Sequence, residues 1–118
     1  MNNIRGKILW IDDEIHHLKP HILFLEEKGY EITQASNGQD GTVLTEKNDF
    51  DLILLDQSMP GLDGMETLSI LKKIRSNIPV IMITKTEDEW LMDEAITSQV
   101  EQFLIKPVNP SQIFMACK

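Results

Sequence analysis

Five short apolar runs recur along this chain of 118 residues, and their spacing limits the folds that it can adopt. The runs cover Lys7–Ile11, Tyr30–Ala35, Leu52–Leu55, Val80–Ile83 and Gln102–Ile105. Each has the length of a strand, and the segments between them carry apolar residues three or four positions apart, as on one face of a helix. Because apolar strands that alternate with helices form parallel sheets covered on both sides, we predict an α/β fold with a doubly wound five-stranded parallel sheet and five helices.

The first two helical segments contain residues that fit a helix poorly. Apolar residues recur from Ile15 to Leu25, but Pro20 lies inside this pattern, and an interior proline costs a helix about 3 kcal/mol. We therefore expect the first helix to start late or to bend near Lys19. The second segment follows Asn37, which can cap a helix, and contains Gly41, which weakens one.

The length and the apolar content indicate one domain that covers residues 1–118. With 42% hydrophobic residues, the chain is long enough to bury a sizeable core. The last helical segment, from about Pro110 to Lys118, is short for a helix that must cover an apolar sheet. We expect the chain to end inside a helix that continues in a longer protein.

The charge and the apolar runs also exclude several functions. A net charge of −8 repels phosphate backbones and anionic lipids, so we expect no direct binding of nucleic acid. No apolar stretch is long enough to span a bilayer, and the single Cys117 cannot form an internal disulfide. These features predict a cytoplasmic protein that is not attached to a membrane.

Polar residues follow four of the predicted strands. Asp12 and Asp13 follow the first, Asp56 the third, Thr84 the fourth and Lys106 the fifth. In an open parallel sheet, chemistry gathers at the carboxyl ends of the strands. We therefore expect these side chains to meet in one crevice.

The residue types in this crevice indicate phosphoryl chemistry on a metal ion. Three converging carboxylates repel one another unless a cation lies among them, and oxygen ligands of this kind suit Mg²⁺. The hydroxyl of Thr84 and the ammonium of Lys106 can receive an anion bound to that ion. A phosphoryl group fits this description, with Asp56 as its nucleophile. Pro60, Gly61 and Gly64 would shape the loop that leaves Asp56 exposed to the donor.

Taken together, these motifs resemble the receiver domain of two-component response regulators, the CheY-like domains, over the whole chain. The matching features are Asp12-Asp13, Asp56 followed by Met59-Pro60-Gly61 and Asp63-Gly64, Thr84, and Lys106-Pro107. The resemblance implies the strand order 2-1-3-4-5. It also implies a phosphoprotein that acts as a signalling switch and not as a metabolic enzyme, although it catalyses its own phosphotransfer and autodephosphorylation. Its partners would be a sensor histidine kinase, a fused or separate output domain, and a second copy bound through the fourth helix, fifth strand and fifth helix.

The resemblance implies a role for each site residue. Asp56 would take a phosphoryl group from a phosphohistidine of the kinase. Asp13, Asp56 and the backbone carbonyl of Ser58 would bind Mg²⁺ directly, and Asp12 would act mainly through a bound water.

The remaining site residues would respond to the phosphoryl group. Lys106 would neutralise its charge, and Thr84 would move to hydrogen-bond it. Phe103 would turn inward as Thr84 moves. The resemblance also implies a cis peptide bond between Lys106 and Pro107.

Two further features bear on which subgroup of the response regulators this chain resembles. The run Met82–Trp90, together with Lys106–Pro110, resembles the PorX-like regulators, whose receiver is fused to an alkaline-phosphatase-like output domain. Lys85 departs from the family pattern, because the position after the switch threonine is usually small.

Three other functions compete with a phosphorylated switch. A haloacid-dehalogenase-type phosphatase needs a second acid two residues after its nucleophile, where this chain has Ser58. A flavodoxin-like FMN binder needs a phosphate loop after the first strand, where Asp12 and Asp13 would repel phosphate. A degenerate receiver, acting only as a protein-binding module, would normally lack one of the acids or the lysine.

Two of the histidines form a second candidate metal site. His17 and His21 lie four residues apart, a spacing that can place two metal ligands on one helix face. Because Pro20 intervenes and no third ligand is evident, we expect them to be solvated.

Overall fold

Strands far apart in the sequence lie side by side in one parallel sheet, in the order β2-β1-β3-β4-β5 that was predicted. The computed structural model describes residues 5–57, 59–84 and 99–117. The strands are β1 (Gly6–Ile11), β2 (Tyr30–Ala35), β3 (Leu52–Asp56), β4 (Val80–Thr84) and β5 (Gln102–Ile105). Three of the predicted strands are thus one residue longer, β1 at its start, at Gly6, and β3 and β4 at their ends, at Asp56 and Thr84.

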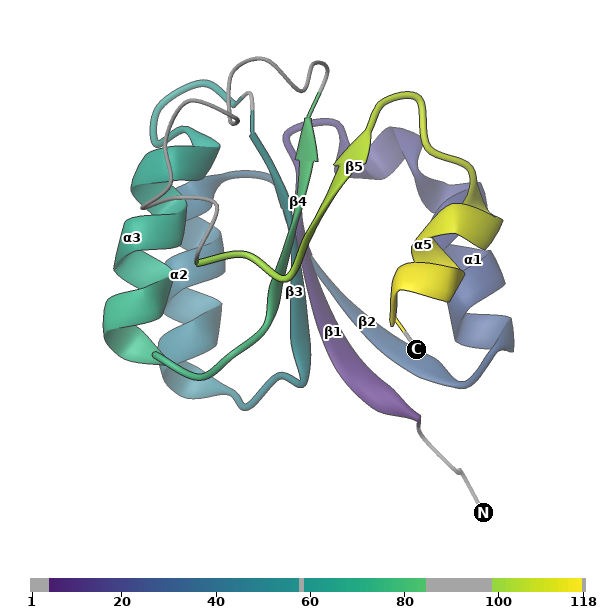
Figure 1. Ribbon diagram of the computed structural model, residues 1–118, viewed down its shortest axis with the longest axis horizontal. Coiled ribbons are helices and arrows are strands. Elements are labelled where there is room, and N and C mark those ends of the chain that lie inside the picture. The colour runs from purple at the N-terminus through teal and green to yellow at the C-terminus, as the bar shows by residue number, and fades with distance from the viewer. Residues whose placement is uncertain (1–4, 58, 85–98, 118) are drawn as a thin grey trace.

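Helices cover both faces of this sheet. They are α1 (Lys19–Glu27), α2 (Gly38–Lys47), α3 (Gly64–Ile74) and α5 (Pro110–Cys117), with a short 3₁₀ helix η1 (Ile15–His17) before α1. Figure 1 shows α2 and α3 on one side of the strands and α1 and α5 on the other. The doubly wound fold is therefore confirmed, whereas the predicted fourth helix falls on residues 85–98, outside the described residues. Within the described ranges, no helix is long and apolar enough to cross a membrane.

The first helix starts late, as Pro20 predicted. After η1 the chain passes through Leu18, and α1 begins at Lys19 with the proline in its first turn. The missing N–H of a proline is harmless there, because the first N–H groups of a helix have no partner within it. The break between η1 and α1 therefore follows from one residue.

The helix α2 begins after the predicted cap residue Asn37, and its packing accounts for the glycine at position 41. The side chain of Asn37 accepts a hydrogen bond from the N–H of Asp40 at 2.8 Å. A Cβ atom on Gly41 would lie only 2.3 Å from the Cδ1 atom of Ile11, so α2 packs directly against β1 at this point. Close packing thus offsets the low helix propensity of glycine.

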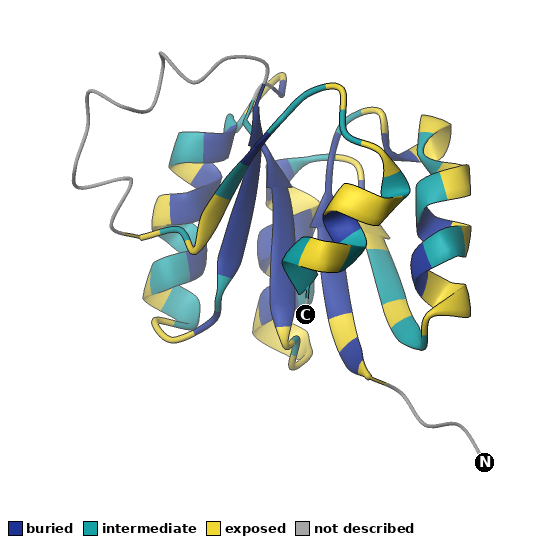
Figure 2. Cartoon of the chain, turned by 45° about the vertical axis from the view of Figure 1, so that its right-hand side comes forward, coloured by how far each residue is buried: buried dark blue, intermediate teal, exposed yellow. Residues whose placement is uncertain are grey.

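The core has two layers because side chains of a strand alternate between the faces of the sheet. Leu9 and Ile11 pack toward α2 and α3, whereas Ile8 and Trp10 pack toward α1 and α5. β1, β3 and β4 are almost completely buried, as Figure 2 shows. The edge strands β2 and β5 are more exposed, so burial on both faces, which we predicted for the strands in general, holds only for the three central ones.

Candidate functional site

The register of β1 and β3 brings the acidic residues together. Ile11 of β1 is paired with Leu55 of β3, so the next residues, Asp12 just after β1 and Asp56 at the end of β3, lie at the same height. Asp12, Asp13 and Asp56 each offer a carboxylate oxygen, and these oxygens lie within 4.8 Å of one another. The predicted cluster of three acids at the carboxyl edge of the sheet is therefore present.

The register of β3, β4 and β5 brings the other two polar residues to the same edge. Asp56 is paired with Ile83, and Thr84 is paired with Ile105. Lys106 follows β5 directly, and its N–H donates a hydrogen bond to the carbonyl of Thr84 at 2.7 Å. This bond ties the start of the segment after β5 to the end of β4.

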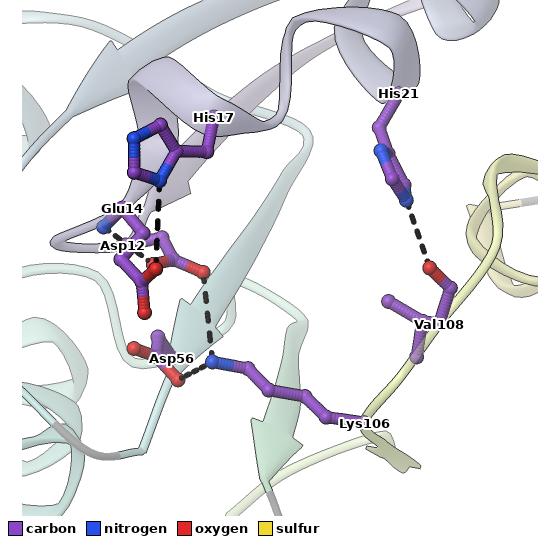
Figure 3. Close-up of polar contacts among 7 residues, drawn as sticks. All are labelled: Asp12, Glu14, His17, His21, Asp56, Lys106 and Val108. Carbon is purple, nitrogen blue, oxygen red and sulfur yellow. Dashed lines mark hydrogen bonds and ion pairs between the residues drawn. The ribbon is translucent and has the colours of Figure 1, made fainter.

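Lys106 reaches back over the sheet to the carboxylates (Figure 3). Its Nζ atom lies 2.9 Å from Oδ1 of Asp56 and 4.0 Å from Oδ2 of Asp12. The Asp56 side chain is 1% exposed, so the expectation that the loop leaves it exposed is wrong; the Lys106 side chain, 26% exposed, lies over it on the solvent side. The peptide bond between Lys106 and Pro107 is cis, as predicted.

Burial dominates the electrostatics of this site. Loss of water raises the pKa of Asp56 to about 6, and the charge of Asp12 adds to this effect, while Lys106 opposes it. Burial also raises the pKa of Asp12. Burial alone would lower the pKa of Lys106, but its contact with Asp56 outweighs that effect and raises it. The site thus holds more negative charge than one ammonium can neutralise.

Two hydrogen-bonding observations separate Asp12 from Asp56. Oδ1 of Asp12 accepts a hydrogen bond from the N–H of Glu14 at 2.8 Å, so this acid also caps the turn that follows β1. Oδ2 of Asp56 is buried and accepts no hydrogen bond from any described residue. A buried oxygen without a donor is costly, and a cation among the three acids would relieve that cost. Oxygen donors of this kind fit Mg²⁺. Ser58, the fourth predicted ligand, lies outside the described residues.

The backbone around Asp56 is fixed by the first turn of α3. Asp63 and Glu66 form a reciprocal cap at the start of this helix. A Cβ atom on Gly64 would lie 2.6 Å from Cα of Gln57 and 2.8 Å from the carbonyl oxygen of Asp56. Only glycine lets the helix approach this closely, so the Gly64 that follows the loop has a packing role that its place in the sequence does not reveal.

The two predicted switch residues lie on neighbouring strands, Thr84 at the end of β4 and Phe103 near the start of β5, where it is paired with Met82. Thr84 is 1% exposed at the end of β4. Phe103 of β5 is partly buried and packs against the core layer beneath α2 and α3. Lys85, the departure from the family pattern, lies outside the described residues.

The expectation for the histidines is wrong at one of the two positions. Nε2 of His21 lies 2.8 Å from the carbonyl oxygen of Val108, and its other ring nitrogen is buried. His17 is exposed, with Nδ1 3.5 Å from a carboxylate oxygen of Glu14. No signal in the sequence pointed to the first contact, because its partner is a backbone atom 87 residues away.

Comparison with known families agrees with this geometry. The family model of the response regulator receiver domain matches residues 8–118. The chain is 31% identical over 113 residues to the transcriptional regulatory protein SrrA of Staphylococcus aureus, an alignment that covers 96% of this chain and 46% of SrrA. The chain therefore spans about half the length of this curated relative.

Solved structures resemble the whole fold. A CheY-like response regulator receiver domain protein from Methanospirillum hungatei JF-1 superimposes with a TM-score of 0.85 at 26% identity, covering 98% of this chain and 91% of that one. The response regulator protein TrrA from Thermotoga maritima, in complex with Mg²⁺–BeF, gives a TM-score of 0.82 at 25% identity, covering 94% of this chain and 95% of that one.

Proposed function

The chain belongs to the response regulator receiver domain family of two-component systems, and from this premise we propose that Asp56 is the residue that accepts the phosphoryl group. The other acids of the cluster are less suited to this role. Asp12 uses one oxygen to cap a turn, and Asp13 is not at the end of a strand. Asp56 ends the fully buried β3, and the next turn is fixed by Gly64.

One observation carries this assignment. The Asp56 carboxylate is buried and forms an ion pair with the Lys106 ammonium at 2.9 Å from Oδ1, while neither oxygen accepts a hydrogen bond with good geometry from the described residues. The ion pair orients the carboxylate, and both oxygens keep lone pairs for other groups. A nucleophile held in one orientation reacts faster than one that rotates freely.

The reaction is a transfer of one phosphoryl group. An oxygen of Asp56 attacks the phosphorus of a phosphohistidine, an O–P bond forms, and the P–N bond breaks. The departing imidazole nitrogen keeps the electron pair and takes a proton from solvent. Lys106 neutralises part of the charge on the phosphoryl oxygens as they approach. Autodephosphorylation reverses the modification, since water attacks the same phosphorus and returns Asp56 with inorganic phosphate.

Asp12, Asp13 and Asp56 are the described residues that would hold Mg²⁺, with the carbonyl of Ser58 as a further ligand. When bound, this ion supplies positive charge that neutralises phosphoryl oxygens. The complex of the similar Thermotoga maritima protein with Mg²⁺–BeF supports this choice of metal.

Phosphorylation would act on the ends of β4 and β5. The added charge and acceptor oxygens at Asp56 attract the hydroxyl of Thr84, which lies at the end of the adjacent strand. Movement of Thr84 would leave room for Phe103 of β5 to turn inward. The face formed by the fourth helix, β5 and α5 would then change shape, and it would pass the signal to an output domain or to a second copy of the chain.

The proposed partners are a kinase and an output domain. A sensor histidine kinase would supply the phosphoryl group in the cytoplasm, and the output would be a fused or separate domain. A net charge of −8 favours protein partners over nucleic acid. The resemblance to PorX-like regulators remains a prediction about the output domain.

Intact-mass spectrometry tests the assignment. Wild-type protein treated with acetyl phosphate and Mg²⁺ should gain the mass of one phosphoryl group, and Asp56→Asn should gain none. Asp49→Asn is the matched control, because the Asp49 side chain is 98% exposed, and it should be modified like wild type. Modification of Asp56→Asn to the wild-type level would contradict the proposal.

A further inference from the structure

His21 joins α1 to the segment that carries Lys106. Its Nε2 atom lies 2.8 Å from the carbonyl oxygen of Val108, two residues after Lys106 (Figure 3). A carbonyl oxygen can only accept, so Nε2 carries the hydrogen and donates it. This contact links parts of the chain that are 87 residues apart.

The position of the His21 ring is set from a second side by Trp10. The ring centroids lie 6.2 Å apart with an angle of 78° between the planes, which is an edge-to-face contact. Trp10 is 1% exposed in β1, so its buried ring restricts the position of the histidine ring. Nδ1 of His21 is buried without a hydrogen-bond partner among the described residues. If this position served packing alone, an apolar side chain would be favoured. The hydrogen bond to Val108 therefore explains why a histidine is present here.

The segment after β5, residues 106–109, is hydrogen-bonded to other elements at Lys106 and at Val108, and it ends in the cap of α5. At its start, the N–H of Lys106 donates to the carbonyl of Thr84 at 2.7 Å. At its end, Asn109 and Gln112 exchange reciprocal hydrogen bonds of 2.8 and 2.9 Å at the beginning of α5. Between these points, His21 bonds the segment to α1, and the Val108 side chain packs against the core layer that includes Ile22 and Leu25 of that helix.

A cavity lies beside this contact. It has a volume of about 470 Å³, and its lining includes Trp10, Asp12, His21, Lys106 and Val108. The stem of Lys106 is therefore not packed tightly on this side. Because neighbouring atoms do not confine the stem of Lys106 on this side, the position of its backbone determines where the ammonium can reach.

We infer that His21 is a positioning residue for Lys106. Its hydrogen bond fixes the Val108 carbonyl, and the fixed segment holds the Lys106 ammonium 2.9 Å from Asp56. The consequence for phosphoryl transfer rests on the proposed function of Asp56, whereas the positioning itself does not.

Two substitutions separate the donor from the bulk of the ring. His21→Gln keeps an N–H at nearly the place of Nε2, and His21→Met has a similar length but no donor. If His21 positions Lys106, His21→Met should impair the site and His21→Gln should preserve it. A role in packing alone would give the two variants similar effects.

The first readout does not require phosphorylation. The purified chain is treated with an acetylating N-hydroxysuccinimide ester, and the modification of Lys106 is quantified by peptide mass spectrometry. Release of the ammonium from Asp56 should raise its labelling by about threefold or more in His21→Met, within the range for residues that act through a shared contact. Asp56→Asn serves as the fully released reference. Wild-type labelling of Lys106 in His21→Met, or equal increases in both His21 variants, would overturn the inference.

The second readout is the rate of phosphorylation by acetyl phosphate with Mg²⁺. We expect His21→Met to be slower than wild type by about threefold or more and His21→Gln to be close to wild type. In a Lys106→Ala background, His21→Met should cause no further loss, because the residue through which it acts is gone. An equal loss in both backgrounds would show that His21 acts on the site by another route and would overturn the inference.

The two readouts also distinguish this inference from the proposed function. If wild-type protein takes up no phosphoryl group, the proposed function of Asp56 fails, while the labelling of Lys106 still decides whether His21 positions it. If phosphorylation proceeds but labelling is unchanged in His21→Met, only the inference fails.

Discussion

Asp56→Asn should make the protein more stable in buffer without metal, although it removes the proposed phosphorylation site. The Asp56 side chain is 1% exposed and lies beside Asp12, so its charge is both dehydrated and repelled. Asparagine has nearly the same shape and carries no charge. The substitution therefore removes an unfavourable charge without leaving a cavity.

The size of the effect follows from the pKa of Asp56. Burial raises this pKa from 3.8 to about 6, and one unit corresponds to 1.36 kcal/mol, so folding with an ionised Asp56 at pH 7.5 costs roughly 3 kcal/mol. The variant also loses the partner of Lys106. Because that side chain is 26% exposed and can be rehydrated, we expect a net gain of about 1–2 kcal/mol in the free energy of unfolding.

The same shift fixes the sign of the pH dependence. The folded-state pKa is above the unfolded one, so the folded protein keeps a proton that the unfolded chain releases between pH 3.8 and about 6. Stability from this group is therefore present at low pH and lost as the pH rises through that window. From pH 7 to pH 5, the wild type should gain about 1 kcal/mol relative to Asp56→Asn.

Urea unfolding in EDTA, followed by circular dichroism at pH 5 and pH 7.5, measures both quantities. Asp49→Asn is again the control, because its side chain is 98% exposed and loss of its surface ion pair with Arg75 should change stability by less than about 1 kcal/mol. If Asp56→Asn is less stable than wild type at pH 7.5 and keeps the wild-type pH dependence, burial does not control this carboxylate.

Three further perturbations test the packing, the metal ligands and the thiol. Gly64→Ala should lower the free energy of unfolding by about 1–3 kcal/mol in urea titrations, because a Cβ would lie 2.6 Å from Cα of Gln57. Asp13→Ala should weaken Mg²⁺ binding more than Asp12→Ala in calorimetric titrations, because Asp12 already spends one oxygen on a backbone N–H; the reverse order would contradict the ligand roles. Burial raises the pKa of the Cys117 thiol from 9.0 to about 11, so iodoacetamide at pH 8 should modify it on the order of 100-fold more slowly than in the urea-unfolded chain, as mass spectrometry would measure.

The local elements could be predicted from the sequence, because they depend on residues a few positions apart. Periodicity located β2 and β5 to the residue, at Tyr30–Ala35 and Gln102–Ile105. Pro20 set the start of α1, and Asn37 set the start of α2. In each case a neighbour within one turn decides whether a backbone N–H finds a partner.

The sequence also indicated which side chains gather at the site, because parallel strands end at one edge of the sheet. It could not give the contacts among them. The 2.9 Å contact between Asp56 and Lys106 depends on the pairing of β3, β4 and β5, and on the path of the chain after β5. The roles assigned to these residues, and to Ser58, remain predictions.

The roles of Gly41, Gly64 and His21 became evident only from the packing of the folded chain. Each depends on a contact that no local pattern encodes. The two glycines permit close approaches between helices and the strands or loops beside them. His21 donates to a backbone carbonyl 87 residues away, and because every residue has a carbonyl, its partner leaves no mark in the sequence. Only the packing of α1 beside the segment after β5 selects Val108 as the acceptor.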